Sequence, residues 1–274
     1  MDVDAYLARI GFRSAPAQAR ELIAALVWRH VQSIPFENID AYLGRRVSLD
    51  PVDVERKLVH AGRGGWCFEQ NLLLGNALRA LGFDVTDLAG RVVWGRAPDA
   101  MTPRTHRVLL VHADGRDWVV DVGFGGQMLT AVLDLAVEAP QETSHEPFRL
   151  RRIGDEERLL ESLIQGEWKP LYRFDLRPQL PIDFEAANYQ LVHDPASHFT
   201  QGLIVSVVAP QGRHILRGRE LVHHPLGGQT TVRGLDSPAA VIAVLREVFG
   251  LDIDAGLEAA LLARLSQAGS AARS

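Results

Sequence analysis

The hydrophobic pattern of this chain changes at residue 84. Up to residue 83, apolar residues recur every three or four positions, as in the run from Leu22 to Val27, which is the spacing of amphipathic helices. From Asp84 to about Ser206, short runs rich in β-branched and aromatic residues alternate with Gly, Pro and Asp turns. The pattern therefore predicts an α+β protein in which helices come first and an antiparallel sheet or small barrel follows.

The stretch HRVLLVHADGRDWVVDVGF predicts a β-hairpin. Its central Asp-Gly pair is typical of a two-residue type I′ turn, which would place Ala113 opposite Arg116. Counting back from this turn, His106 and Asp121 project from the same face as a diagonal pair, about 7–8 Å apart between backbones and within side-chain reach. A three-residue loop would instead put the two side chains on opposite faces.

Asp121 lies between WVV and VGFGG, in what should be a buried strand, where a carboxylate needs a partner. His106 supplies one, in the arrangement by which a carboxylate orients an imidazole. The alternatives are that His106 is an ordinary histidine at a strand end and that Asp121 caps the following turn. Contact of the pair with a nucleophile would decide between these interpretations.

The only cysteine, Cys67, follows the glycine-rich run GRGG and opens the helical pattern CFEQNLLLGNALRALGF. The N-terminus of a helix favours thiolate over thiol, and its first N–H groups can stabilise an oxyanion. The glycines before it would let the backbone come close to a substrate. Cys67, His106 and Asp121 therefore form a candidate catalytic triad, and the alternative is that Cys67 is an inert core residue.

Composition limits the partners and the compartment. The net charge is -5 without a long run of either sign, which argues against nucleic acid and anionic membranes as partners. The start of the chain carries acidic residues where a secretory signal would be basic, and no stretch is apolar over the ~18 residues that a membrane helix needs. A single cysteine excludes an internal disulfide and a multi-cysteine metal site within one chain. These features predict a cytoplasmic protein that binds a small molecule and needs no metal.

Two further motifs carry less information. VGFGGQM is similar to a phosphate-binding loop, but it lacks the Lys-Ser/Thr pair that follows in a Walker motif. HDPASH and the His223-His224 pair do not have metal-ligand spacing, so we expect these histidines to be exposed.

Taken together, the motifs resemble those of the arylamine N-acetyltransferase family, in the family's order and with similar spacing. The resemblance rests on RGGWCFEQN, THR and DVGFGG, and on YLARIGF, IPFENID, SHFTQGLIVS and VFGLDID, which together cover nearly the whole chain. It implies a three-part α+β fold with a cysteine-protease-like Cys-His-Asp core. The parts are an N-terminal helical bundle over 1–83, which carries the nucleophile, a central antiparallel β-barrel over 84–195, which carries the histidine and aspartate, and a C-terminal α/β lid over 196–274.

The resemblance also implies a reaction. A family member moves an acetyl group from acetyl-CoA, a co-substrate, to a small aromatic amine or hydrazine by a ping-pong mechanism with an acetyl-cysteine intermediate. By this resemblance Cys67 attacks the thioester, His106 accepts the proton from the thiol and later from the amine, and Asp121 fixes the tautomer of His106.

Further residues take roles from the same resemblance. Phe124, Gly125 and Gly126 match the family's loop beside the pantetheine and diphosphate of CoA. Phe36 and Phe124 are candidates for flanking the aromatic ring of the acceptor, with core packing as the alternative.

By the same resemblance, three charged residues match positions that form a structural ion-pair cluster near the active cysteine in members of the family. They are Arg9, Glu37 and Arg63. We expect them to support the fold and to take no part in the chemistry.

Other functions share these residues. A papain-like or transglutaminase-like hydrolase uses the same Cys-His-Asp logic, and a non-catalytic binding protein would keep Cys67 as a core residue. The preferred amine, the range of acyl groups, the physiological role and the choice between monomer and homodimer stay open at this level.

Overall fold

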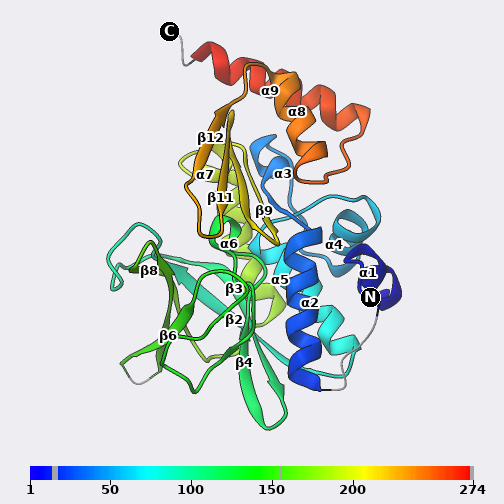
Figure 1. Ribbon diagram of the computed structural model, residues 1–274. Coiled ribbons are helices and arrows are strands. Elements are labelled where there is room, and N and C mark those ends of the chain that lie inside the picture. Colours follow the sequence, from blue (N-terminus) through cyan, green and yellow to red (C-terminus); the bar gives the residue numbers. More distant parts are fainter. Residues whose placement is uncertain (14–17, 155, 272–274) are drawn as a thin grey trace.

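The computed structural model describes residues 1–13, 18–154 and 156–271, and Figure 1 shows helices at the two ends of the chain with strands between them. The N-terminal helical segments are α1 (Val3–Arg9), α2 (Ala19–Ser33), α3 (Ile39–Tyr42), α4 (Pro51–Glu55), the π-helical turn η1 (Arg56–His60) and α5 (Cys67–Ala80).

Local signals set the ends of these helices. Asp50 accepts a hydrogen bond from the N–H of Val52 at 2.8 Å, and Pro51 occupies the first position of α4. After α5, Gly82 adopts a φ of +90°, which favours glycine and ends the helix. The predicted helical start at Cys67 is confirmed, because Cys67 is the first residue of α5.

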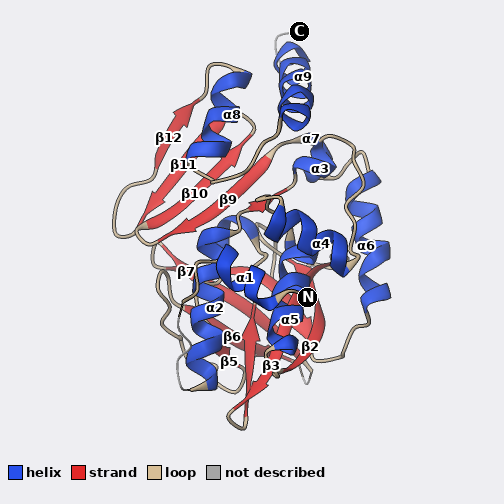
Figure 2. Ribbon diagram, turned by 90° about the vertical axis from the view of Figure 1, so that its right-hand side faces the viewer, coloured by secondary structure: helices blue, strands red, loops and turns tan. Residues whose placement is uncertain are grey.

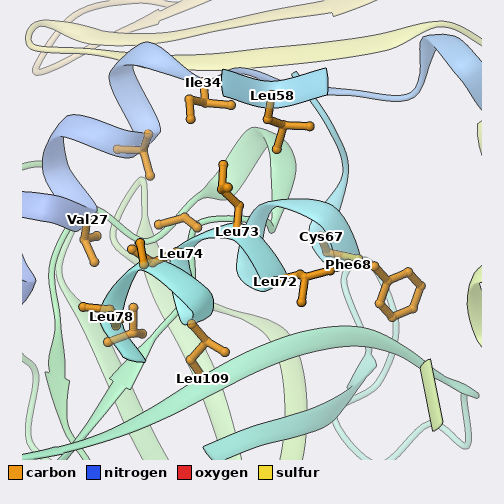
Figure 3. Packing of buried hydrophobic residues seen from close by; sticks show 14 of the residues in the cluster. Val27, Ile34, Leu58, Cys67, Phe68, Leu72, Leu73, Leu74, Leu78 and Leu109 are labelled. Atoms are coloured by element: carbon orange, nitrogen blue, oxygen red, sulfur yellow. The ribbon is translucent and has the colours of Figure 1, made fainter. Parts of the chain in front are cut away.

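The helix α5 lies inside the largest hydrophobic core. Every residue from Cys67 to Gly75 is buried, so this part of the helix is enclosed on all sides, whereas Arg79 and Ala80 at its end are exposed. Figure 3 shows its leucines among side chains from α2, η1 and β3, and the labelled members are Val27, Ile34, Leu58, Cys67, Phe68, Leu72, Leu73, Leu74, Leu78 and Leu109. Burial of each leucine stabilises the fold by about 1.5–3 kcal/mol, so packing fixes the position of the cysteine at the start of the helix.

A seven-stranded antiparallel sheet follows, in the order β5-β4-β3-β2-β8-β7-β6. Its strands are β2 (Asp84–Val92), β3 (Arg104–Ala113), β4 (Arg116–Val120), β5 (Leu133–Asp134), β6 (Phe148–Ile153), β7 (Glu157–Ile164) and β8 (Glu167–Asp175). The predicted hairpin register is confirmed: Ala113 faces Arg116, and Asp114 and Gly115 have φ of +53° and +71°, as a type I′ turn requires.

Gln141 brings the two edge strands of this sheet together. Its backbone N–H donates to the carbonyl of Phe148 at 2.7 Å, and its side-chain Oε1 accepts from the N–H of Asp134 at 2.8 Å. Phe148 begins β6 and Asp134 ends β5, so the sheet curls into a nearly closed barrel. The predicted α+β class with a central antiparallel barrel is confirmed.

The second sheet has five strands in the order β1-β9-β10-β11-β12. Its strands are β1 (Phe36–Glu37), β9 (Ile204–Ala209), β10 (Gly212–Arg217), β11 (Glu220–Pro225) and β12 (Thr231–Gly234). The C-terminal helices α8 (Pro238–Glu247) and α9 (Ala255–Ala271) lie against this sheet in Figure 2, and α7 (His198–Gln201) precedes it. Val205 and Leu216 of the sheet share a core with Val241 and Leu245 of α8.

One strand of this second sheet comes from the opposite end of the chain. In β1, Phe36 faces Ser206 and Glu37 faces Val205, so the IPFENID motif adds an edge strand to the C-terminal sheet. The helical pattern that predicted helices up to residue 83 gave no sign of a strand at this point. The borders at residues 83 and 195 therefore remain a proposed division of the chain.

A helix also interrupts the segment that was predicted to hold strands. The helix α6 (Pro181–His193) begins with Pro181, and the carboxylate of Asp183 accepts from the N–H of Leu180 at 2.7 Å. The expectation of short strands and turns over 84–206 was wrong for these residues, because capping and a buried face that includes Phe184 favour a helix, and it was also wrong for α7. Among the described helices, none has the length and apolarity needed to cross a membrane.

Candidate active site

Cys67 lies at the start of α5, beside the strand that carries His106. The carboxylate of Glu69 accepts from the N–H of Trp66 at 3.1 Å, which caps α5 and places Cys67 in its first turn. The side chain is buried, and its Sγ lies 3.5 Å from the carbonyl oxygen of Thr105, the residue before His106.

The glycine run before Cys67 packs against the chain itself. A Cβ on Gly64 would lie 2.1 Å from the carbonyl oxygen of Pro35, so only glycine allows the two backbones to meet. This contact sets Gly65 beside Phe36 as a parallel bridge. The expectation that these glycines admit a substrate is thus replaced at Gly64 by backbone-to-backbone packing.

His106 and Asp121 form the predicted pair. Nε2 of His106 lies 2.7 Å from Oδ2 of Asp121, and both side chains are buried, with exposures of 2% and 0%. The other oxygen of Asp121 accepts from the N–H of Gly123 at 2.8 Å and from Nδ2 of Asn71 at 2.9 Å. With Nε2 engaged by Asp121, the Nδ1 nitrogen of His106 is left for the thiol of Cys67.

The electrostatics of the pair favour its charged form. Burial alone lowers the pKa of His106, but the charge and hydrogen bond of Asp121, together with Cys67, outweigh burial and raise that pKa to about 10. Burial opposes ionisation of Asp121, but His106 and the hydrogen bonds from Asn71 and Gly123 lower its pKa below the usual range. At neutral pH the site therefore holds an imidazolium and a carboxylate.

This pair also links stability to pH. Because the folded-state pKa of His106 is raised, its protonation stabilises the fold fully below its ordinary pKa of 6.5, and that contribution is lost as the pH rises through about 10. The lowered pKa of Asp121 acts in the opposite direction, since its contribution is present above 3.8 and is lost as the pH falls below that value.

Asn71 is a site residue that the sequence analysis missed. It lies one turn after Cys67 on α5, and besides Asp121 it donates to the carbonyl of Arg107 at 2.6 Å and accepts from the N–H of Val122 at 3.0 Å. It therefore fastens the nucleophile helix to both strands of the hairpin. The available signal was its i+4 spacing from Cys67, which puts both residues on one helix face.

Gly123 allows the hairpin to approach the nucleophile. A Cβ at this position would lie 2.6 Å from Cα of Cys67 and 2.9 Å from Nδ2 of Asn71. The motif DVGFGG therefore needs a glycine here for close packing against α5.

Aromatic rings enclose the imidazole. The ring of Tyr172 in β8 lies 4.6 Å from that of His106, and the half-buried Phe124 lies 5.3 Å away at an interplanar angle of 88°. The hydroxyl of Tyr172 is buried and makes no hydrogen bond within the described residues. Burial, and then the charge of Asp121, raise the pKa of Tyr172 well above its usual range, so the phenol stays neutral. Tyr172 was also missed, because no motif marked it.

The glycine turn lies beside Phe36. Gly125 begins the short 3-10 helix η2 (Gly125–Gln127), and a Cβ on Gly125 would touch the ring of Phe36 at 3.7 Å. Phe36 is buried and its ring lies 6.1 Å from that of Phe199. The structure thus brings together Phe36, Phe124 and the turn, which the sequence had separated by almost ninety positions.

A buried ion-pair cluster lies beneath the nucleophile loop. Arg63 donates from Nη2 to Glu37 at 2.6 Å, and Lys57 lies 2.7 Å from Asp40 and 2.8 Å from Glu69. Burial raises the pKa of Glu69 to about 7, although Lys57 opposes this rise. Lys57, Asp40 and Glu69 join the predicted Glu37–Arg63 pair.

Arg9 does not belong to this cluster, contrary to the prediction. It ends α1, where its Nε donates to the carbonyl of Leu58 at 3.1 Å, and within the described residues it makes no ion pair with Glu37. Of its charged neighbours, Asp252 is the one that favours its cation, while burial lowers its pKa.

The cluster predicts a stability effect. We expect Glu37→Ala to reduce the free energy of unfolding by about 3 kcal/mol, because Arg63 donates from both Nε and Nη2 to one Glu37 oxygen and would keep only the longer contact of 3.4 Å with Asp40. Urea unfolding followed by circular dichroism measures this change. Glu258→Ala is the matched control, since it breaks the exposed Arg246–Glu258 pair at 2.7 Å and should cost about 0.5 kcal/mol or less. Equal midpoints for the two variants would contradict a supporting role for Glu37.

The histidine motifs are mostly exposed, as expected. His193, His198 and His224 are exposed, but His223 is half-buried because its ring stacks on His214 at 4.4 Å across β10 and β11. The described residues contain no group of three or more His, Cys, Asp or Glu side chains arranged to hold a metal ion.

Comparison with known proteins agrees with this geometry. The family model described as N-acetyltransferase matches residues 21–257, a range that contains Cys67, His106 and Asp121. The arylamine N-acetyltransferase of Mycolicibacterium smegmatis is 45% identical over 257 residues, which cover 92% of this chain and 93% of the relative. The chain belongs to the arylamine N-acetyltransferase family.

Other members of the arylamine N-acetyltransferase family support the same assignment. The enzyme of Escherichia coli (strain K12) is 41% identical, with coverage of 91% of this chain and 88% of the relative. The structure of the Mycobacterium marinum arylamine N-acetyltransferase in complex with CoA superposes with a TM-score of 0.92 at 37% identity, covering 97% of this chain and 99% of that one. The family assignment made from the sequence motifs, and the acetyltransferase class that goes with it, are confirmed.

Proposed function

We propose that this acetyltransferase moves an acetyl group from acetyl-CoA to aromatic amines or hydrazines by a ping-pong mechanism through acetyl-Cys67. The observation that carries the proposal is the Cys67 thiol at the buried start of α5, next to an imidazolium that Asp121 holds at 2.7 Å. The names of the M. smegmatis and E. coli relatives support arylamines as acceptors, and the CoA complex of the M. marinum protein supports CoA as the donor's carrier.

In the first half-reaction, the Cys67 thiolate attacks the carbonyl carbon of the thioester. A carbon–sulfur bond to Cys67 forms, the bond to the CoA sulfur breaks, and the CoA thiolate takes the proton that His106 holds. N–H groups in the first turn of α5, which helices leave without intrahelical partners, would stabilise the oxyanion of the intermediate. His106 is then neutral.

In the second half-reaction, the amine attacks the carbonyl carbon of acetyl-Cys67. Neutral His106 accepts the proton of the amine, the bond to sulfur breaks, and the cysteine thiolate returns beside an imidazolium. Asp121 keeps Nδ1 of His106 directed at the reaction throughout, because it binds Nε2. One base thus serves both half-reactions.

We propose further that Phe124, Gly125 and Gly126 contact the CoA moiety and that Phe36 and Phe124 flank the acceptor ring. The contact of Phe124 with His106 at 5.3 Å supports a place for it beside the reacting atoms. The burial of Phe36 against Gly125 supports a contribution to the shape of the turn.

The test of this function is an intact-mass spectrum of the protein mixed with acetyl-CoA in the absence of amine. We expect one acetyl group per chain, located on Cys67 by peptide mapping and removed when an arylamine such as aniline is added. Loss of the acetyl group to water at the same rate without amine, or cleavage of peptides without CoA, would favour the cysteine-hydrolase alternative.

The charge of His106 predicts how fast the thiol reacts. Because the pKa of His106 is about 10, its imidazolium persists at neutral pH beside Cys67, and a neighbouring cation favours the reactive thiolate. We expect His106→Gln to slow alkylation of Cys67 by iodoacetamide at pH 7 by at least about tenfold. An unchanged rate in this variant would favour a non-catalytic binding protein.

We also propose that the protein acts in the cytoplasm, as a monomer or homodimer, with the three parts 1–83, 84–195 and 196–274 supplying nucleophile, base and lid. A single cysteine supports a reducing compartment. Light scattering coupled to size exclusion measures the mass in solution.

A further inference from the structure

Residues of the second sheet contact the glycine turn of the active site, Phe124–Gly125–Gly126. Arg213 in β10 donates from Nη1 to the carbonyl oxygen of Met128 at 2.9 Å, directly after the turn. Two residues further along the same strand, Cδ1 of Ile215 would lie 2.8 Å from a Cβ on Gly126. The turn therefore packs closely on a strand of the C-terminal lid.

A buried ion pair holds Arg213 in place. Its Nη2 and Nε lie 2.6 Å and 3.3 Å from the two carboxylate oxygens of Glu146. The guanidinium is almost fully buried, whereas the Glu146 side chain is 25% exposed. The planar fork of arginine engages the carboxylate with two of its nitrogens and leaves Nη1 for Met128.

Glu146 is itself fixed to the segment that follows the turn. The carbonyl of Glu146 accepts from Oγ1 of Thr143 at 2.7 Å, and that hydroxyl lies 2.9 Å from Oγ1 of Thr130. The neighbouring His145 donates from Nε2 to the carbonyls of Ala209 and Gly212 at 3.0 Å and 3.2 Å. The loop before β6 therefore ties the turn to the β9–β10 hairpin.

The two ends of the turn are thus held by different groups. At its start, the N–H of Gly123 donates to Asp121 of the catalytic group at 2.8 Å. At its end, Arg213 holds Met128 at 2.9 Å. A buried ion pair usually stabilises a fold no more than apolar side chains of similar volume would. What Arg213 adds at this position is a directed hydrogen bond to the backbone of the turn, which an apolar side chain could not make.

We infer that Arg213, held by Glu146, is a positioning residue that sets the glycine turn for the acyl donor. This inference rests on the proposed function, since it assigns the turn to the CoA part of the donor. Loss of Arg213 should weaken the use of acetyl-CoA while leaving the Cys67–His106–Asp121 chemistry in place.

The test compares two acyl donors in single-turnover acylation of Cys67. Acetyl-CoA requires the CoA contacts of the turn, whereas p-nitrophenyl acetate is an activated ester without CoA and reports on the thiol alone. For Arg213→Gln we expect the second-order rate constant of acylation by acetyl-CoA to fall by about tenfold. The fall should come from a higher half-saturating concentration of acetyl-CoA and not from a lower limiting rate. The rate constant with the ester should change by less than about twofold. Arg213→Lys should recover part of the loss, because lysine can still donate to Met128 but not in a fork.

Two further variants separate positioning from general damage. Glu146→Gln should act in the same direction as Arg213→Gln, and the double variant should be no worse than Arg213→Gln alone, because the two residues act as a unit. Arg246→Gln is the control: it breaks the Arg246–Glu258 pair at 2.7 Å between α8 and α9, and should change neither rate. Equal losses with both donors, or no loss with acetyl-CoA, would overturn the inference.

A readout without any donor keeps this inference separate from the proposed function. Hydrogen exchange in a peptide that covers residues 123–130 should be faster in Arg213→Gln than in the parent, and unchanged in Arg246→Gln. If the parent takes no acetyl group from acetyl-CoA, the proposed function fails, and exchange still reports whether Arg213 orders the turn. Unchanged exchange would overturn the positioning role.

Discussion

Replacing Cys67 by alanine should abolish acetyl transfer, with a loss of at least about 10⁴-fold in turnover. The covalent intermediate needs a sulfur nucleophile, and no other thiol can replace it because the chain has one cysteine. Release of CoA in the presence of an arylamine measures the rate, and the intact-mass spectrum should show no acetyl group on the variant.

The fold of this variant should survive, which makes the loss interpretable. Removing one sulfur atom from the start of a helix that is enclosed by leucines costs about 1 kcal/mol, well within the stability of a chain of this size. Thermal unfolding by circular dichroism checks this point. A folded Cys67→Ala protein that keeps more than a few per cent of the parent activity would show that the acetyl group does not pass through Cys67.

Asp121→Asn should reduce kcat/KM by about 10³–10⁴-fold without unfolding the protein. The substitution removes the charge that keeps His106 protonated, and an amide NH₂ facing Nε2 would favour the tautomer whose proton lies on Nδ1, towards Cys67. His106 could then no longer accept a proton on the side of the reaction. The pH profile should change as well, because the pKa of about 10 depends on Asp121.

The same hairpin provides a matched control for this prediction. His112 and Asp117 form a second histidine–aspartate pair at 3.0 Å, but its side chains are 55% and 48% exposed. Asp117→Asn should change kcat/KM by less than about twofold, since exposed pairs contribute little. Similar losses in Asp121→Asn and Asp117→Asn would show that Asp121 acts on the hairpin and not on the reaction.

The errors of the sequence analysis follow from tertiary contacts. Arg9 was grouped with Glu37 by motif, yet the nearby carbonyl of Leu58 takes its hydrogen bond. Asn71 and Tyr172 carry no local signature, because the partners that make them part of the site lie on strands distant in sequence. The strand β1 was unpredictable for the same reason: two residues contain no periodicity, and the sheet that receives them begins at residue 204.

Short-range chemistry determined what could be predicted from the sequence alone. Caps such as Asp50 and the Asp-Gly turn act over two to four residues, so helix starts, the hairpin register and the facing of His106 and Asp121 follow from local sequence. Only the tertiary structure decided that Cys67 meets this pair, through Asn71 and the close approach of Gly123, and that Arg213 holds the neighbouring turn. Such contacts join residues far apart in the chain, and the packing of the whole core selects them from many combinations that the local sequence allows equally.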